Sequence, residues 1–257
     1  MRRGTVASVP KQPPAVSARH ATAGELPSGE MSLGEAALAW MAGWVIGNIA
    51  ASVVLAVSGQ SDVASTQRPV WLSASMALAI WVPQLTALAI AARMFATGRP
   101  ITDYSLRFAP IDLLGIPLGI VSQLVLLKVI YWPLHAAWPQ RFSDDQLDKN
   151  ARQLYDTAKG GWIVLLVFVI VVGAPLVEEI VYRGLLQTAA RRRFPGWVAV
   201  VGVAAFFALI HFRWVEYPGL FAFGLVLGTC ALVTRRLGMS VLAHVAFNAT
   251  ALVLVAR

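Results

Sequence analysis

Long apolar runs constrain this chain more than any other feature. A helix needs about 20 apolar residues to cross the roughly 30 Å hydrocarbon layer of a membrane. Segments of comparable length occur at residues 33–57, 70–92, 112–134, 161–189, 197–212, 217–234 and 239–256. Charged residues make up only 13% of the chain, against about 25% in soluble domains. The sequence therefore predicts an all-α, polytopic transmembrane helical bundle of about seven spans, and it excludes a soluble enzyme.

The residues before the first apolar segment have a different character. They contain several prolines and small residues, and they lack an apolar run that could form the core of a signal peptide. We expect residues 1–32 to be a disordered cytoplasmic tail and residues 33–257 to form the transmembrane domain. Because the first apolar segment is too long for a cleaved signal, it should remain as a membrane anchor.

Basic residues are distributed unevenly between the two sides of the predicted spans. The chain has 21 Lys and Arg against 13 Asp and Glu, a net charge of +8. Twelve of these basic residues fall on the side of the N-terminus and seven on the opposite side. Since cytoplasmic loops are enriched in Lys and Arg, we expect a cytoplasmic N-terminus in a multi-pass protein of the plasma membrane. The positive charge suits anionic membrane lipids, and no nucleic-acid partner is expected.

Two other patterns bear on the fold. Apolar residues at helical spacing in the outer loop, residues 136–160, predict a short amphipathic helix on the membrane surface. Glycines four residues apart predict close helix crossings in the third and sixth spans; the pairs are Gly115 with Gly119 and Gly224 with Gly228.

Two adjacent acids interrupt the fourth apolar segment. A charged side chain in the middle of a bilayer costs about 2.5–3.5 kcal/mol on insertion scales, so it needs a partner or a function. Arg183 follows Glu179 by four residues, a spacing that predicts an ion pair on one helix face. Glu178 points about 100° away, so we expect it to have other neighbours and to be free to act as a general base. Pro175 removes a backbone hydrogen bond and is expected to kink the helix. A buried ion network that only orients helices is the structural alternative.

Polar residues also occur in two later spans. His211 ends the fifth span, and His244 and Asn248 share one face of the seventh because they are four residues apart. A single histidine inside a membrane is more often a packing group than a catalyst. Counting helical rise from the cytoplasmic ends, however, brings the acids, His211 and Asn248 to similar depths, and a short offset of the seventh helix would add His244. A shared polar cavity is therefore favoured over scattered polar residues.

The constellation has the parts needed to hydrolyse an amide with an activated water. A carboxylate can take a proton from water, and histidine and amide groups can stabilise a developing oxyanion. The sequence contains no Gly-x-Ser-x-Gly and no His-Glu-x-x-His motif. The single cysteine, Cys230, lies in an apolar run and is expected to pack in the core.

These residues resemble the motifs of a known family. Glu178-Glu179-x-x-x-Arg183, Phe207-x-x-x-His211 and His244-x-x-x-Asn248 occur in the order found in the CPBP intramembrane proteases. This family is also called the type II CAAX prenyl endopeptidase or Abi family, and the likeness covers about residues 161–250. No motif of the family is found in the first 130 residues.

The resemblance implies a role for each residue. Glu178 would be the general base that activates water together with His211. His244 and Asn248 would stabilise the oxyanion. Glu179 and Arg183 would fix the site and orient the substrate. The substrate would be a peptide or a membrane-anchored protein, of the CAAX type or of the bacteriocin-processing type, surrounded by membrane lipids.

A metal cofactor is left open by the residues themselves. Glu178, His211 and His244 could form a zinc site with two histidines and one carboxylate, and the family is often described as metalloproteases. The same residues can also work as a glutamate-type protease without Zn²⁺ or another divalent metal. The sequence does not decide between the two, and we slightly prefer the metal-independent chemistry.

Two other functions use the same residue types. Intramembrane Glu, His and Arg are also relay groups, so a proton- or ion-coupled transporter is one alternative. Many transporters contain internal repeats, which we do not find in this sequence. A non-catalytic immunity or scaffold protein, which would use the site only for binding, is the other.

Overall fold

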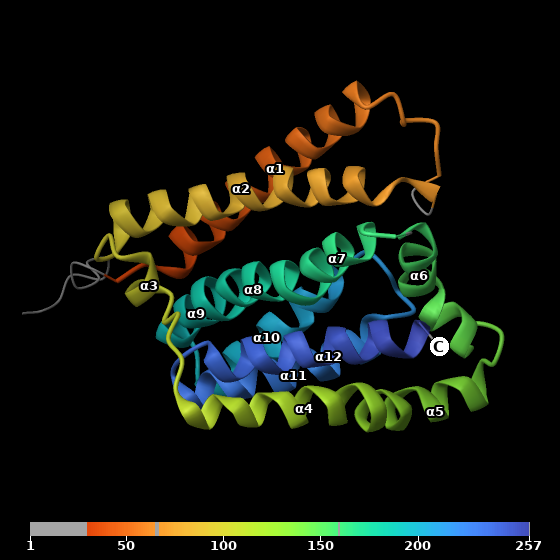
Figure 1. Cartoon of the computed structure of the whole chain (residues 1–257). Coiled ribbons are helices and arrows are strands. Elements are labelled where there is room, and N and C mark those ends of the chain that lie inside the picture. Colours follow the sequence, from red (N-terminus) through yellow and green to blue (C-terminus); the bar gives the residue numbers. More distant parts are fainter. Residues whose placement is uncertain (1–29, 65–66, 159, 257) are drawn as a thin grey trace, which may run out of the picture.

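The computed structural model describes residues 30–64, 67–158 and 160–256, and all regular elements in this part of the chain are helices (Figure 1). The predicted disordered tail lies almost entirely outside the described residues. The elements are α1 Leu33–Val57, α2 Val70–Phe95, α3 Pro100–Asp103, η2 Pro110–Leu114, α4 Gly115–Val121, η3 Ser122–Leu126, α5 Leu127–Ala137, α6 Asp144–Thr157, α7 Trp162–Val167, η4 Phe168–Gly173, α8 Ala174–Glu179, η5 Ile180–Gln187, α9 Thr188–Arg193, α10 Gly196–Leu209, α11 Tyr217–Thr234 and α12 Gly238–Val255. The prediction of an all-α transmembrane bundle is confirmed.

Several consecutive elements join into long helices. The helix from Pro110 to Ala137 combines η2, α4, η3 and α5, and the helix from Trp162 to Arg193, here called the central helix, combines α7 to α9. In the part of the chain that the structure describes, six helices are long and apolar enough to cross a membrane. Figure 1 shows the α1–α2 hairpin on one side of the central helix, with α10, α11 and α12 on its other side and α4 and α5 beyond them.

The fifth predicted span is the exception in length. A helix forms there, but α10 has 14 residues, which is about 21 Å and shorter than the hydrocarbon layer. The chain leaves the helix at Ile210, and Phe212 adopts a left-handed backbone with φ of 53°. An ion pair between Arg213 and Glu216, at 3.0 Å, lies in the turn that follows. The predicted end at residue 212 is therefore wrong by three residues, and His211 lies in this turn.

Close glycine contacts set the position of α12, which carries two of the predicted site residues. A Cβ atom on Gly115 would collide with the carbonyl oxygen of Met239, and one on Gly119 with the carbonyl oxygen of Ala243. Only glycine allows this approach of the two backbones. On α11, Gly224 and Gly228 similarly approach Ala204 and the side chain of Gln187. Both predicted close crossings are confirmed.

The loop after α5 contains the predicted amphipathic helix, α6. Ser143 caps this helix by accepting a hydrogen bond from the backbone N–H of Gln146. Apolar side chains of α6, including Leu154 and Tyr155, pack against the ends of the central helix and α12. The helix thus closes one end of the bundle.

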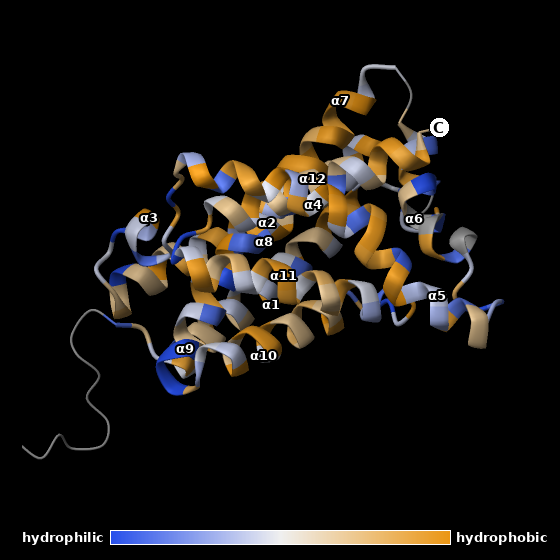
Figure 2. Ribbon diagram, turned by 90° about the horizontal axis from the view of Figure 1, so that it is seen from below, coloured by the Kyte–Doolittle hydropathy of each residue, from blue (hydrophilic) through white to orange (hydrophobic). Residues whose placement is uncertain are grey.

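The long helices are hydrophobic along most of their length, and hydrophilic residues gather at their ends (Figure 2). The strongest gathering lies at α9, which ends in Arg191, Arg192 and Arg193. This distribution is expected of an integral membrane protein. The orientation of this basic end toward the cytoplasm stays a prediction from the loop charges.

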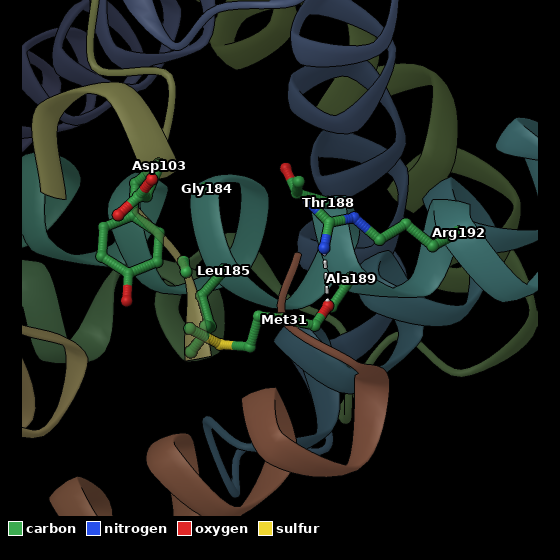
Figure 3. Close-up of a pocket in the computed structure, with 9 residues that line it drawn as sticks. Met31, Asp103, Gly184, Leu185, Thr188, Ala189 and Arg192 are labelled. Carbon is green, nitrogen blue, oxygen red and sulfur yellow. Dashed lines mark hydrogen bonds between the residues drawn. The ribbon is translucent and has the colours of Figure 1, made fainter. Parts of the chain in front are cut away.

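The chain before α1 is attached to this basic end. Arg192 donates a hydrogen bond to the carbonyl of Met31 at 2.9 Å, beside a small pocket of about 40 Å³ (Figure 3). Gly184 lies on the opposite wall, where a Cβ atom would approach the backbone of Tyr104 to 3.0 Å. The connection between α2 and η2 therefore packs directly on the central helix.

Candidate functional site

The core of the site is a fully buried ion pair on the central helix. Arg183 donates to Oε1 of Glu179 at 2.9 Å, and neither side chain is exposed. The guanidinium also donates to the carbonyl of Gly224 at 3.2 Å and lies 4.7 Å from the ring centre of Phe207. The predicted i, i+4 pair is confirmed in its geometry, and it joins the central helix to α10 and α11.

His244 reaches both glutamates from α12. Its Nδ1 lies 2.9 Å from Oε1 of Glu179, and its Nε2 lies 3.8 Å from Oε2 of Glu178. The expectation that the adjacent acids have different neighbours is therefore wrong, because the two nitrogens of one imidazole face one acid each. The environments of the acids still differ, since Glu178 is 29% exposed and Glu179 is fully buried.

His211 lies just beyond the end of α10. Its Nδ1 is 2.6 Å from the carbonyl oxygen of Phe207, which leaves Nε2 as the nitrogen available to other groups. The ring of Phe207 packs against both imidazoles, with ring centres 4.8 Å from His211 and 6.0 Å from His244. Among the described residues, His211 forms no hydrogen bond or ion pair with Glu178 or Glu179. The structure thus places both histidines around one aromatic ring.

Glu216 adds a carboxyl group on the side of His211. Burial raises the pKa of this side chain, and the charges of Arg213 and His211 act in the opposite direction. Sequence reasoning did not single out this residue, because it lies in a short polar turn between two apolar segments. The turn that ends α10 therefore places the carboxyl group of Glu216 and its partner Arg213 near His211.

Asn248 contacts a different part of the central helix. Its Nδ2 donates to the backbone carbonyl of Ile170 at 2.9 Å. Hydrogen bonding in η4 follows a five-residue step, since the N–H of Ala174 donates to the carbonyl of Val169. In this register the carbonyl of Ile170 requires a donor from position 175, and Pro175 has none. The amide of Asn248 therefore satisfies the carbonyl that the proline leaves without a donor, and it keeps a second N–H for another acceptor.

This arrangement predicts a measurable coupling between Asn248 and Pro175. Asn248→Ala should lower the free energy of unfolding by about 1–3 kcal/mol, because it leaves a backbone carbonyl unpaired in an apolar setting. In a Pro175→Ala background the same substitution should have a smaller effect, since residue 175 then carries an N–H. Unfolding of the four proteins in detergent micelles measures this difference. Equal effects of Asn248→Ala in the two backgrounds would refute the pairing.

The residues considered for a metal site are not grouped around a common point in the structure. Within residues 30–64, 67–158 and 160–256, no three His, Cys, Asp or Glu side chains are grouped so that they could hold a metal ion. Nδ1 of His244 is engaged by Glu179 and Nδ1 of His211 by a backbone carbonyl, so Nε2 is the free nitrogen of each histidine. In the structure, Glu178, His211 and His244 do not converge on one point as three ligands of an ion.

Two buried polar contacts were not expected from the sequence. Gln187 is 1% exposed and donates to the carbonyl of Gly228 at 2.8 Å; its spacing of four residues from Arg183 was a usable signal. Asp112 is fully buried and accepts from Arg236 at 2.9 Å. These two residues are 124 positions apart, and no local pattern indicates that they pair.

Comparison with known proteins agrees with the motifs. Residues 160–250 match the family model described as Type II CAAX prenyl endopeptidase Rce1-like. This segment contains the central helix and continues into α12, so it includes all six predicted site residues. No curated protein and no solved structure matched the chain.

Proposed function

We propose that the protein hydrolyses a peptide bond with a water activated inside the membrane, since residues 160–250 match the type II CAAX prenyl endopeptidase Rce1-like family model. The observation that carries the proposal is the position of His244 between the two acids of the central helix. The substrate would be a peptide or a membrane-anchored protein, cleaved near its terminus.

Each glutamate has a separate task in this proposal. In the proposed resting state Glu179 accepts a hydrogen bond from Nδ1–H of a neutral His244, whose Nε2 faces Glu178 as an acceptor. A water beside the line that joins Nε2 and the Glu178 carboxylate could donate to both atoms. Glu178 would take a proton from this water as the water oxygen attacks the carbonyl carbon of the substrate. Glu178 would later return the proton to the departing amine. Arg183 keeps Glu179 ionised and in place.

Other groups would act on the substrate itself. The second N–H of Asn248 can donate to a developing oxyanion, while the first remains on Ile170. Nε2 of His211 can contact water or the substrate, because Nδ1 is held by the Phe207 carbonyl. Asn248 lies on α12 and His211 in the turn after α10, so a bound peptide bond would be held between these two segments and the central helix.

The proposal is metal-independent and predicts insensitivity to chelators. The purified full-length protein, assayed against a peptide library in detergent with and without EDTA, should cleave the same peptides at the same rate. The physical reason is that, among the described residues, no three acids, histidines or cysteines are grouped so that they could hold a metal ion. A loss of activity in EDTA that Zn²⁺ restores would refute glutamate-type chemistry, and the absence of any cleavage would count against the protease assignment.

A further inference from the structure

A polar pocket lies at the basic end of the bundle, and neither Glu178 nor Glu179 lines it. It has a volume of about 100 Å³, and four arginines line it: Arg183, Arg191, Arg235 and Arg236. They come from η5, α9 and the turn between α11 and α12. No Asp or Glu is among the residues that line the pocket.

The charges around this pocket do not balance. Arg183 is paired with Glu179, and Arg236 is paired with Asp112, whose carboxylate is fully buried behind it. In the described part of the chain, Arg191 and Arg235 have no ion-pair partner. Two positive charges therefore remain uncompensated at one small concave site, which raises the local concentration of anions.

The floor of the pocket supplies a second, independent observation. Arg183 is only 2% exposed, and its Nε–H has no hydrogen-bond partner. Buried polar groups in native proteins nearly always have a partner, and two residues of the pocket lining keep an unpaired buried atom, Nε of Arg183 and Oε1 of Gln187. Ser105 and Thr188 also line the pocket; the hydroxyl of Thr188 already donates to the carbonyl of Arg183 at 3.1 Å, so the hydroxyl that can serve a ligand is that of Ser105. Guanidinium and hydroxyl donors around one cavity are typical of phosphate sites.

We propose that this pocket binds a phosphate group, supplied either by the headgroup of an anionic phospholipid or by free phosphate. A single phosphate would meet the two unpaired arginines, Arg191 and Arg235, and lie beside the buried guanidinium of Arg183. The pocket lies where the helices end in basic residues (Figure 2), the level at which lipid headgroups meet a membrane protein. The binding proposal does not depend on the peptidase proposal, because it concerns other atoms.

A matched pair of variants on one helix tests the site. Arg191 lines the pocket, whereas Arg193, two residues later, lies over the ring of Phe194 and does not line it. Arg191→Gln and Arg193→Gln remove the same charge from α9. Arg191→Gln and Arg235→Gln should each weaken phosphate binding by roughly tenfold or more, and Arg193→Gln should leave it within about twofold of the original protein.

Two measurements separate the sources of phosphate. Inorganic phosphate is titrated into the full-length protein in detergent, at ionic strength matched with chloride, and the unfolding temperature is followed; acetate is titrated in parallel. Native mass spectrometry of protein taken from phosphatidylglycerol or phosphatidylcholine nanodiscs then reports the retained lipid. The site is supported if binding is lost with Arg191→Gln and kept with Arg193→Gln. Binding of inorganic phosphate identifies free phosphate as the source, and retention of phosphatidylglycerol identifies the lipid headgroup. Three results would overturn the proposal: Arg193→Gln loses binding to the same degree as Arg191→Gln, acetate binds in preference to phosphate, or neither measurement detects binding.

Discussion

Replacing Glu178 by Gln is expected to abolish peptide cleavage while the protein still folds. Glutamine keeps the size of the side chain but cannot accept a proton from water, and general-base catalysis typically contributes about 100- to 10,000-fold to a rate. Glu178 is 29% exposed, and its closest charged partner is Nε2 of His244 at 3.8 Å, so its charge contributes little to stability. The measurement is the initial rate of cleavage of one peptide from the library, compared at equal protein concentration.

Asp62→Asn is the matched control for Glu178→Gln. Asp62 is an exposed acid in the loop between α1 and α2, so its neutralisation changes the net charge equally and should leave the cleavage rate unchanged. Thermal unfolding of both variants should follow that of the original protein. Full cleavage by Glu178→Gln would exclude Glu178 as the base and would favour a non-catalytic binding role for the site.

Much of the fold could be predicted because helix length and hydrophobic content are properties of contiguous sequence. The amphipathic helix α6 and the glycine crossings of Gly115 and Gly119 also depend on spacing within one segment, and both were predicted. The end of α10 was not, because the chain remains partly apolar through Phe212 and Trp214. The turn there depends on the left-handed backbone of Phe212 and on the ion pair of Arg213 with Glu216. Neither feature can be predicted from the hydrophobicity of the segment.

In the candidate site, too, the contact between residues close in sequence could be predicted, whereas the contacts between distant residues could not. The pair of Glu179 and Arg183 follows from its i, i+4 spacing. The contact of His244 with Glu179 joins residues 65 positions apart, and that of Asn248 with Ile170 joins residues 78 apart. Both depend on how α12 packs on the central helix, so the sequence predicted that these side chains meet this helix but not which atoms they contact.

Arg183→Met is expected to be the most destabilising single change in the site. It leaves the Glu179 carboxylate buried without its cation, and breaking a buried ion pair by removing one partner typically costs about 3–5 kcal/mol. The double variant Glu179→Gln with Arg183→Met removes both charges and should recover most of this loss, because neutral replacements of buried pairs are often tolerated. Unfolding in detergent, followed by tryptophan fluorescence, measures the four members of the cycle.

The cycle separates folding from chemistry, because the double variant should be stable and still inactive. The glutamine side chain introduced by Glu179→Gln can present either its oxygen or its NH2 group to Nδ1 of His244, so it no longer fixes the tautomer that leaves Nε2 as the acceptor facing Glu178. Arg213→Met is the control for losing an arginine from an ion pair; its partner is partly exposed, so it should cost less than about 1 kcal/mol. A double variant that regains both stability and cleavage would show that the pair serves only to hold the helices together. One that regains stability alone would indicate that the buried charges are kept for the reaction.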